Sequence, residues 1–175
     1  LQNKALKVID SLQTPFYLTG GTALSRCYFN HRYSDDLDLF VNKDQKFVTL
    51  ADQVTTELDS KFELEIVLKT KSYYSLNIDG ILKIEMVNDV AFRVGDLEKK
   101  DIFSKVDSVH NILSNKLSAV ISRDEPKDVV DIWVISKNIQ VNWPDTFQAV
   151  GSKAVGIFPP DVAQRLADFP VNLLG

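Results

Sequence analysis

Residues 16–41 read FYLTGGTALSRCYFNHRYSDDLDLFV, with a glycine pair between a short apolar run and two aspartates. The run Phe16–Leu18 is typical of a buried strand, and Gly20-Gly21-Thr22 ends it where the next residues favour a helix. Glycine lets the backbone approach a ligand closely, and the first free N–H groups of a helix attract anions. The turn therefore predicts a site for the phosphates of a nucleoside triphosphate (NTP), with an ordinary tight strand-to-helix connection as the alternative.

The segment Asp36-Leu37-Asp38-Leu39 alternates polar and apolar residues, as a half-buried strand does. Asp36 and Asp38 then project from one face, roughly 6 to 7 Å apart at a rise of about 3.3 Å per residue. Neighbouring carboxylates repel unless a cation lies between them, and hard oxygen ligands suit Mg²⁺ or Mn²⁺. The pair predicts a metal site, with a solvated strand end as the alternative.

A hairpin is predicted over residues 73–87, with the dipeptide Asp79-Gly80 as a two-residue turn between apolar runs. Lys83 and Glu85 then share one face of the returning strand. Beside the aspartates, Glu85 would supply the third carboxylate that a two-metal site uses. Lys83 is either the charge partner of Glu85 or a phosphate contact, and the spacing does not separate the two.

Two helices are predicted over residues 111–122 and 126–136. Lys116 and Arg123 are seven residues apart, so both could meet a triphosphate or a nucleic-acid backbone, or simply form the wet side of a helix. Asp128 is a favourable charge at a helix start, and Asp131 is a candidate tie between the helices.

The remaining chain predicts helices over residues 3–12 and 44–60 and a strand over 62–68 with one wet face. Residues 88–109 are charged and irregular, apart from an extended piece near Val106. From Trp143 onward, prolines punctuate short helices.

The runs G-G-T-A-L-x-R and S-D-D-L-D-L resemble the signature of the polymerase-β-like nucleotidyltransferase superfamily and, within it, of AbiEii-type abortive-infection toxins. Lys83-Ile84-Glu85 looks like the Lys-x-Glu strand of that family. The family's Lys…Arg…Asp-x-x-Asp helical signature is matched by Lys116, Arg123, Lys127, Asp128 and Asp131. The resemblance spans Phe16–Val134.

The resemblance implies an α+β fold with a mixed or antiparallel sheet flanked by helices. It implies a nucleotidyltransferase catalytic domain over residues 1–136 and a short helical C-terminal extension over 137–175. The implied reaction moves a nucleoside monophosphate from an NTP to an acceptor hydroxyl, on RNA and in particular a transfer RNA. The implied role is that of a toxin with a cognate antitoxin as partner.

The candidate site residues follow from the patterns and the resemblance together. Arg26, one turn after Thr22, could reach phosphates or pair with an acid in 34–38, and Ser34 could bind phosphate or cap a turn. The catalytic candidates are Asp36, Asp38, Glu85, Lys116 and Asp128, and the metal ligands are Asp36, Asp38 and Glu85. The nucleotide-binding candidates are Gly20, Gly21, Thr22, Arg26, Ser34, Lys83 and Arg123.

Composition narrows the classes of function. A net charge of −4 and a pI near 5.2 argue against a generally basic surface that coats nucleic acid. The single Cys27 forms no internal disulfide and is interpreted as a small buried hydrophobic residue. His31 and His110 are far apart in the sequence and have no Cys or His neighbours that would indicate a zinc site. No apolar run reaches about 20 residues and no signal segment opens the chain, so a cytoplasmic setting is expected.

Two other functions compete with the leading hypothesis. One is a non-catalytic nucleotide-binding or toxin–antitoxin interaction protein; the intact carboxylates Asp36, Asp38 and Glu85 argue against it. The other is a nucleotidyltransferase that acts on a small molecule, which would turn over without RNA.

Overall fold

The computed structural model describes residues 1–90, 92–153 and 156–170. They form two compact units. Unit 1 holds residues 1–90 and 96–107, and unit 2 holds the other described residues. The assignment of 1–136 as the catalytic domain and 137–175 as its extension stays a prediction about function.

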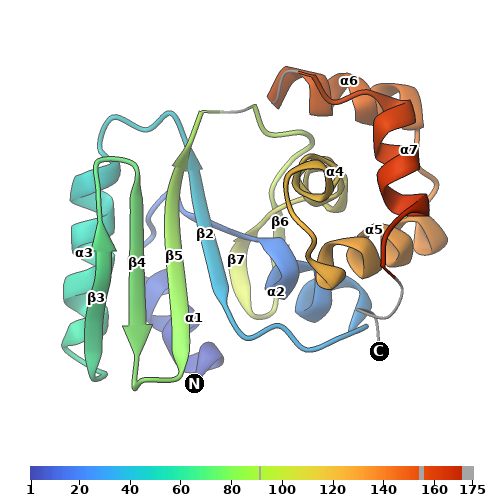
Figure 1. Cartoon of the computed structure of the whole chain (residues 1–175). Coiled ribbons are helices and arrows are strands. Elements are labelled where there is room, and N and C mark those ends of the chain that lie inside the picture. Colours follow the sequence, from blue (N-terminus) through green and yellow to red (C-terminus); the bar gives the residue numbers. More distant parts are fainter. Residues whose placement is uncertain (91, 154–155, 171–175) are drawn as a thin grey trace. The chain divides into compact units, whose positions relative to one another are not determined.

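Unit 1 is built on a mixed sheet, which has seven strands within the described residues (Figure 1). The strand order is β3-β4-β5-β2-β1-β7-β6. Strand β2 runs parallel to β5, β1 runs parallel to β7, and the other neighbours are antiparallel. The strands are β1 (Tyr17–Thr19), β2 (Leu37–Asn42), β3 (Leu64–Lys69), β4 (Tyr73–Ile78), β5 (Leu82–Asp89), β6 (Glu98–Lys100) and β7 (Phe103–Val106). The predicted mixed sheet is confirmed.

Helices α1 (Gln2–Ser11) and α3 (Phe47–Asp59) lie against the same face of this sheet (Figure 1). Their apolar stripes pack on the strand residues that alternate inward, because side chains of a strand point to opposite faces in turn. The fully buried residues of this layer include Leu6, Ile9, Val54, Leu58, Leu37, Leu39, Ile84 and Met86. The other face therefore carries the polar side chains of β2 and β5.

The glycine pair opens α2 (Gly20–Leu24), as predicted, and α2 continues as the π-helical turn η1 (Ser25–Phe29). Asn30 ends η1 with a left-handed backbone, at a φ of 48°. A π-helical turn is rare and frequently marks a functional region. The chain then returns through a loop to β2, beside β1.

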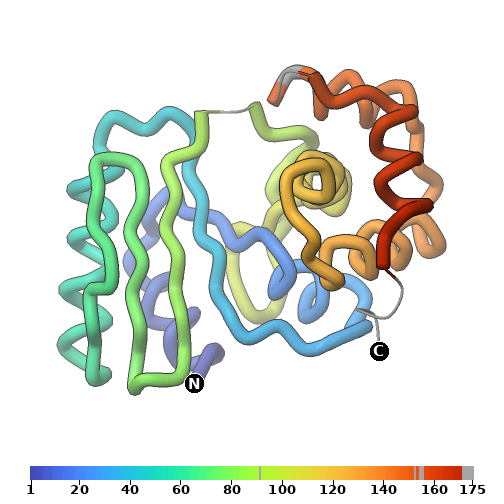
Figure 2. Tube along the Cα trace, in the orientation of Figure 1, coloured from blue at the N-terminus to red at the C-terminus, as the bar shows by residue number. Residues whose placement is uncertain are grey.

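The β4–β5 hairpin is present (Figure 2), but its loop is one residue longer than predicted. Ile78 pairs with Leu82, so the loop contains Asp79, Gly80 and Ile81. Ile81 is 79% exposed, whereas the prediction placed it in the strand. The longer loop moves the register by one residue and sets Ser75 opposite Glu85.

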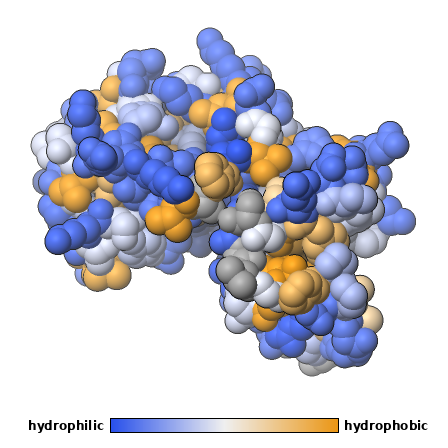
Figure 3. Space-filling model, turned by 90° about the horizontal axis from the view of Figure 1, so that it is seen from above, coloured by the Kyte–Doolittle hydropathy of each residue, from blue (hydrophilic) through white to orange (hydrophobic). Residues whose placement is uncertain are grey.

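Strand β3 differs from its prediction, which gave it one wet face. Ile66, Val67 and Leu68 are 48%, 59% and 49% exposed, so neither face is buried. β3 is an outer strand that pairs only with β4 among the described strands, and its register shifts between Ile66 and Leu68. A register shift in an edge strand twists it away from regular packing. On the face in Figure 3, some hydrophobic residues lie singly among hydrophilic ones and others gather in a small group at the lower right.

Unit 2 is helical in the residues described. Ser108 caps α4 by accepting a hydrogen bond from the backbone N–H of Asn111, so this helix starts two residues earlier than predicted. Pro126 and Pro159 occupy first turns, where a missing N–H costs nothing. The helices are α4 (Val109–Ser122), α5 (Pro126–Asn138), α6 (Trp143–Lys153) and α7 (Pro159–Ala167).

The sequence patterns did not predict strands β6 and β7, although they indicated an extended piece at Val106. β7 is short and pairs with β1 through Leu18 and Val106. Within the described part of the chain, no helix has the length and apolar character needed to cross a membrane.

Candidate functional site

The first part of the site is the contact between β2 and the glycine pair. Gly20 has a φ of +68°, which L-residues rarely adopt, and an added Cβ would lie 2.1 Å from Oδ2 of Asp38. Only glycine therefore lets the carboxylate of Asp38 lie against the backbone at this turn. Asp38 pairs with Thr19 of the antiparallel strand β1, which fixes its position next to the turn.

Glu85 lies beside Asp38 because β2 and β5 run parallel with these two residues in register. Tyr73 and Lys83 both donate hydrogen bonds to Oε1 of Glu85. Burial raises the pKa of Glu85, but the hydrogen bonds from Lys83 and Tyr73, with a smaller contribution from Asp38, lower it below its usual value. Glu85 is thus held as a carboxylate next to Asp38.

Lys83 is the charge partner of Glu85 in this structure, one of the two roles that the spacing left open. The hydrogen bond to Glu85 also raises the pKa of Lys83. Asp36 contributes to the same effect through its charge, so Asp36 lies within electrostatic range of Lys83. A phosphate contact by Lys83 stays a prediction.

The loop that leads to Asp36 is anchored by two side chains of unit 1. The hydroxyl of Thr22 donates a hydrogen bond to the backbone carbonyl of Asp36. The amide of Gln2 donates to the carbonyls of Ser34 and Asp35 at 2.8 and 2.9 Å. Thr22 thereby positions the aspartate segment, and its predicted contact with phosphate stays untested.

The chemistry of these donors fits a hard divalent cation, because carboxylate oxygens are the ligands such ions prefer. Asp38 and Glu85 are in register on adjacent strands and both are partly exposed. Among the described residues, however, no three His, Cys, Asp or Glu side chains are gathered closely enough to form a metal-binding group. The two carboxylates fit the ion as a pair, and the role of Asp36 as a third ligand stays a prediction.

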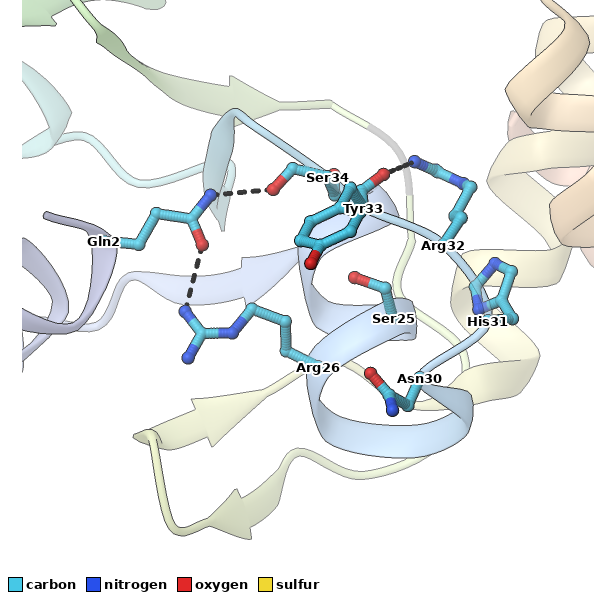
Figure 4. A pocket seen from close by; sticks show the side chains of 8 residues that line it. All are labelled: Gln2, Ser25, Arg26, Asn30, His31, Arg32, Tyr33 and Ser34. Atoms are coloured by element: carbon cyan, nitrogen blue, oxygen red, sulfur yellow. Dashed lines mark hydrogen bonds between the residues drawn. The ribbon is translucent and has the colours of Figure 1, made fainter.

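A pocket of about 530 Å³ lies next to the glycine pair and is lined by η1, the following loop and Gln2 (Figure 4). Arg26 and Ser34 both line it. Arg26 donates hydrogen bonds to the side chains of Gln2 and Asn3 on α1, rather than to an acid in 34–38. Phosphate binding by Arg26 and Ser34 stays a prediction.

Cys27 lies on η1 and is partly buried. Burial raises the pKa of its thiol to about 11, so the reactive thiolate is scarce at neutral pH. This agrees with the interpretation of Cys27 as a hydrophobe.

Unit 2 holds the other predicted residues in a buried ion-pair cluster. Nζ of Lys116 on α4 lies 2.6 Å from Oδ1 of Asp128 and 2.9 Å from Oδ2 of Asp131, both on α5. Nε of Arg123 lies 2.7 Å from Oδ2 of Asp128. Burial raises the pKa of Asp128, but Arg123 and Lys116 outweigh it and hold that pKa below its usual value.

This cluster accounts for the role of Asp131 as a tie between helices. It also shows that Lys116 is buried rather than on the wet side of α4, whereas Lys127 is exposed. The catalytic roles of Lys116 and Asp128 and the phosphate role of Arg123 stay predictions.

Sequence reasoning missed two residues of unit 1, Tyr73 and Arg32. A two-residue hairpin loop would have paired Glu85 with Tyr74, so Tyr73 became visible only with the true loop length. Arg32 covers Gly21, because a Cβ there would lie 2.4 Å from Nη2 of Arg32. Arg32 lies in an irregular loop, where no periodicity predicts which way a side chain points.

Comparison with known proteins gives one related sequence and several related folds. An uncharacterized protein of Aquifex aeolicus is 26% identical over 138 residues, which cover 78% of this chain and 66% of that protein. The chain thus spans about two thirds of the length of this curated relative.

Two solved structures share the fold. JHP933 from Helicobacter pylori has a TM-score of 0.58 at 22% identity, over 99% of this chain and 75% of its own. MenT4, a nucleotidyltransferase toxin from Mycobacterium tuberculosis, has a TM-score of 0.66 at 15% identity, over 91% of this chain and 68% of its own. At these identities the likeness establishes the fold alone.

A family model described as the nucleotidyl transferase AbiEii toxin of type IV toxin–antitoxin systems matches residues 5–156. The match covers the glycine pair, the β2–β5 carboxylates and the ion-pair cluster of α4 and α5. It extends well beyond half of the 175 residues. The chain therefore belongs to the AbiEii nucleotidyl transferase toxin family.

Proposed function

We propose that this chain transfers a nucleoside monophosphate from an NTP to a hydroxyl group of an RNA, with a transfer RNA as the expected acceptor. The observation that carries the proposal is the carboxylate of Asp38, which lies against Gly20 and in register with Glu85. A cation bound by these carboxylates would lie beside the backbone turn that, in this proposal, receives the triphosphate. Membership of a toxin family supports growth arrest as the consequence and an antitoxin as the partner.

In the proposed reaction, the acceptor oxygen forms a bond to the α-phosphorus. The bond from that phosphorus to the bridging oxygen breaks, pyrophosphate leaves with the bonding electrons, and the hydroxyl proton is lost to water. A bound Mg²⁺ would offset the negative charge that surrounds the α-phosphate and orient the reacting oxygens. The protein's contribution is therefore mostly positioning and charge neutralisation.

Different residues of unit 1 would hold the metal ion and position its ligands. Asp38 and Glu85 would hold the metal ion, and Asp36 is proposed as a third ligand. Tyr73 and Lys83 fix Glu85 through its Oε1. Thr22 holds the backbone of Asp36, so that the aspartate segment keeps its place beside the glycine pair.

The test is transfer of label from each α-³²P-NTP in the presence of Mg²⁺ and total bacterial RNA. The intact chain is compared with Asp38→Asn and with the control Asp35→Asn, whose side chain is exposed on the loop just before β2. We expect labelled RNA with the intact chain and Asp35→Asn, and a loss of roughly a hundredfold or more with Asp38→Asn.

Three other outcomes would redirect the proposal. Label on a small molecule without RNA would favour a small-molecule transferase. Binding of NTP without any labelled product would favour the non-catalytic alternative. Equal labelling by Asp38→Asn and the intact chain would remove Asp38 from the site.

A further inference from the structure

The outer edge of β3 has no role in the proposed reaction. β3 lies at one end of the sheet, and its one neighbour among the described strands is β4 (Figure 1). The backbone N–H and C=O groups on its other edge therefore meet no strand within the described part of the chain. An edge of this kind is a template on which a further strand can pair.

The centre of β3 lacks the side chains that usually protect an edge strand. Ile66, Val67 and Leu68 follow one another and are 48%, 59% and 49% exposed. Natural proteins commonly protect such an edge with charged residues or proline. The register shift at these residues bends the strand, but it leaves three apolar side chains about half exposed. Their burial against a partner would be favourable.

The charges on the two sides of this apolar centre are opposite. Glu63 and Glu65 precede it, and Lys69 and Lys71 follow it. All four side chains are exposed. Within the described residues, Lys69 is the member of this group that has an ion-pair partner, Asp52 on α3 at 2.6 Å. The other three charges are therefore available to a binding partner.

This strand is complementary to a reversed copy of itself. In an antiparallel pair of two copies, the acidic end of each strand lies beside the basic end of the other, and the apolar centres meet. A parallel pair would bring like charges together, which is destabilising. An antiparallel pair also obeys a two-fold axis, and two-fold dimers are the commonest oligomers of soluble proteins.

We propose that unit 1 binds a second copy of this chain through the outer edge of β3, with the two strands antiparallel and Val67 near the two-fold axis. The backbone hydrogen bonds of the new strand pair and the contact of the apolar centres would supply the affinity. The flanking charges would set the direction of pairing. One strand pair buries a small area, so the dimer would be weak and reversible. This proposal does not depend on the proposed reaction.

The experiment measures self-association of the intact chain by sedimentation velocity at increasing protein concentration. Val67→Lys places a positive charge at the centre of the interface, where the two copies of the lysine would lie close together. Val90→Lys is the matched control, because Val90 is 76% exposed and follows β5, which is an inner strand of the sheet. We expect a reversible dimer for the intact chain and for Val90→Lys, and a dissociation constant raised by about tenfold or more with Val67→Lys.

Charge-reversed variants test the direction of pairing. Glu63→Lys combined with Glu65→Lys makes both ends of the strand basic, and Lys71→Glu makes the basic end more acidic. Each variant alone should associate more weakly than the intact chain, because complementary charges are lost. An equal mixture of the two should associate more strongly than either alone, because the basic strand then meets the acidic end of its partner. Both variants keep the pair of Lys69 with Asp52.

Three results would overturn the proposal. The first is an intact chain that stays monomeric at every concentration. The second is a dimer that Val67→Lys and Val90→Lys affect equally, which would place the interface on another surface. The third is a mixture of charge-reversed variants that associates no better than its components. If Val67→Lys is poorly folded by circular dichroism, the mixture decides.

Discussion

The two acidic clusters of this protein differ in how their charges are neutralised. In unit 2, Asp128 and Asp131 are 0% exposed, and Lys116 and Arg123 supply positive charge from within the unit. In unit 1, the side chain of Glu85 is 23% exposed, and its ion-pair partner Lys83 is 48% exposed. Asp38 is likewise only partly buried. The aspartates of the first cluster are closed to water, although Arg123 is 52% exposed, whereas the carboxylates of the second cluster are partly open to water.

The difference indicates what each cluster can do. Buried carboxylates need an internal partner, since an unpaired buried charge is costly, and such a cluster holds helices together. Partly exposed carboxylates keep access to solvent and can exchange a cation without unfolding. We therefore expect changes in the Lys116 cluster to affect the fold first, and changes at Asp38 or Glu85 to affect ligands first.

The largest expected effect is that of Lys116→Met. It removes the buried cation that lies against both Asp128 and Asp131 and so weakens the neutralisation of two buried carboxylates, and we expect a loss of about 3 to 5 kcal/mol in the free energy of unfolding. Urea denaturation measures it. The control Lys127→Met, at an exposed lysine of α5, should change stability by less than about 0.5 kcal/mol.

The three buried charges of this cluster can also be removed together, which leaves the half-exposed Arg123 as its remaining charge. Lys116→Met combined with Asp128→Asn and Asp131→Asn removes both buried carboxylates together with the cation between them, so it should recover part of the lost stability. If Lys116→Met alone is as stable as the intact chain, the contrast between the clusters does not hold.

A smaller effect is expected for Gly20→Ala relative to Gly80→Ala. Both glycines have a positive φ, so both variants are strained by about 1 kcal/mol. Only at Gly20 would the new Cβ meet a neighbour, Oδ2 of Asp38, whereas nothing lies within 4 Å at Gly80. We expect Gly20→Ala to cost roughly 1 to 3 kcal/mol more than Gly80→Ala, measured by the same denaturation. Equal losses would mean that Asp38 gives way without cost.

The sequence predicted the parts of the fold that repeat with a regular period. The alternation predicted that Asp36 and Asp38 share one face of their strand and that Lys83 and Glu85 share one face of theirs. The apolar spacing of α3 and α4 predicted both helices. Strands β6 and β7 were not predicted, because they are three and four residues long and such short strands show no clear alternation. The exposure of Ile66 was not predicted, because it depends on which strand lies at the edge of the sheet.

The sequence predicted those residues of the candidate site that lie in recognisable motifs, and it did not predict the others. Asp38 and Glu85 were predicted correctly on neighbouring strands, because each lies in a recognisable motif and in a strand whose alternation shows which face it occupies. Tyr73 depended on one residue in the length of a hairpin loop, and Arg32 depended on the path of an irregular loop. Loop geometry arises from many weak contacts, and neither composition nor spacing encodes it.

The most direct test of the contrast is the binding of Mn²⁺, followed by electron paramagnetic resonance in the presence of NTP. The intact chain is compared with Asp38→Asn and with Asp35→Asn, which removes an exposed carboxyl from the loop just before β2. We predict that Asp38→Asn weakens Mn²⁺ binding by about tenfold or more, because it removes a charged ligand, while Asp35→Asn does not. The same dissociation constant for all three proteins would contradict the account.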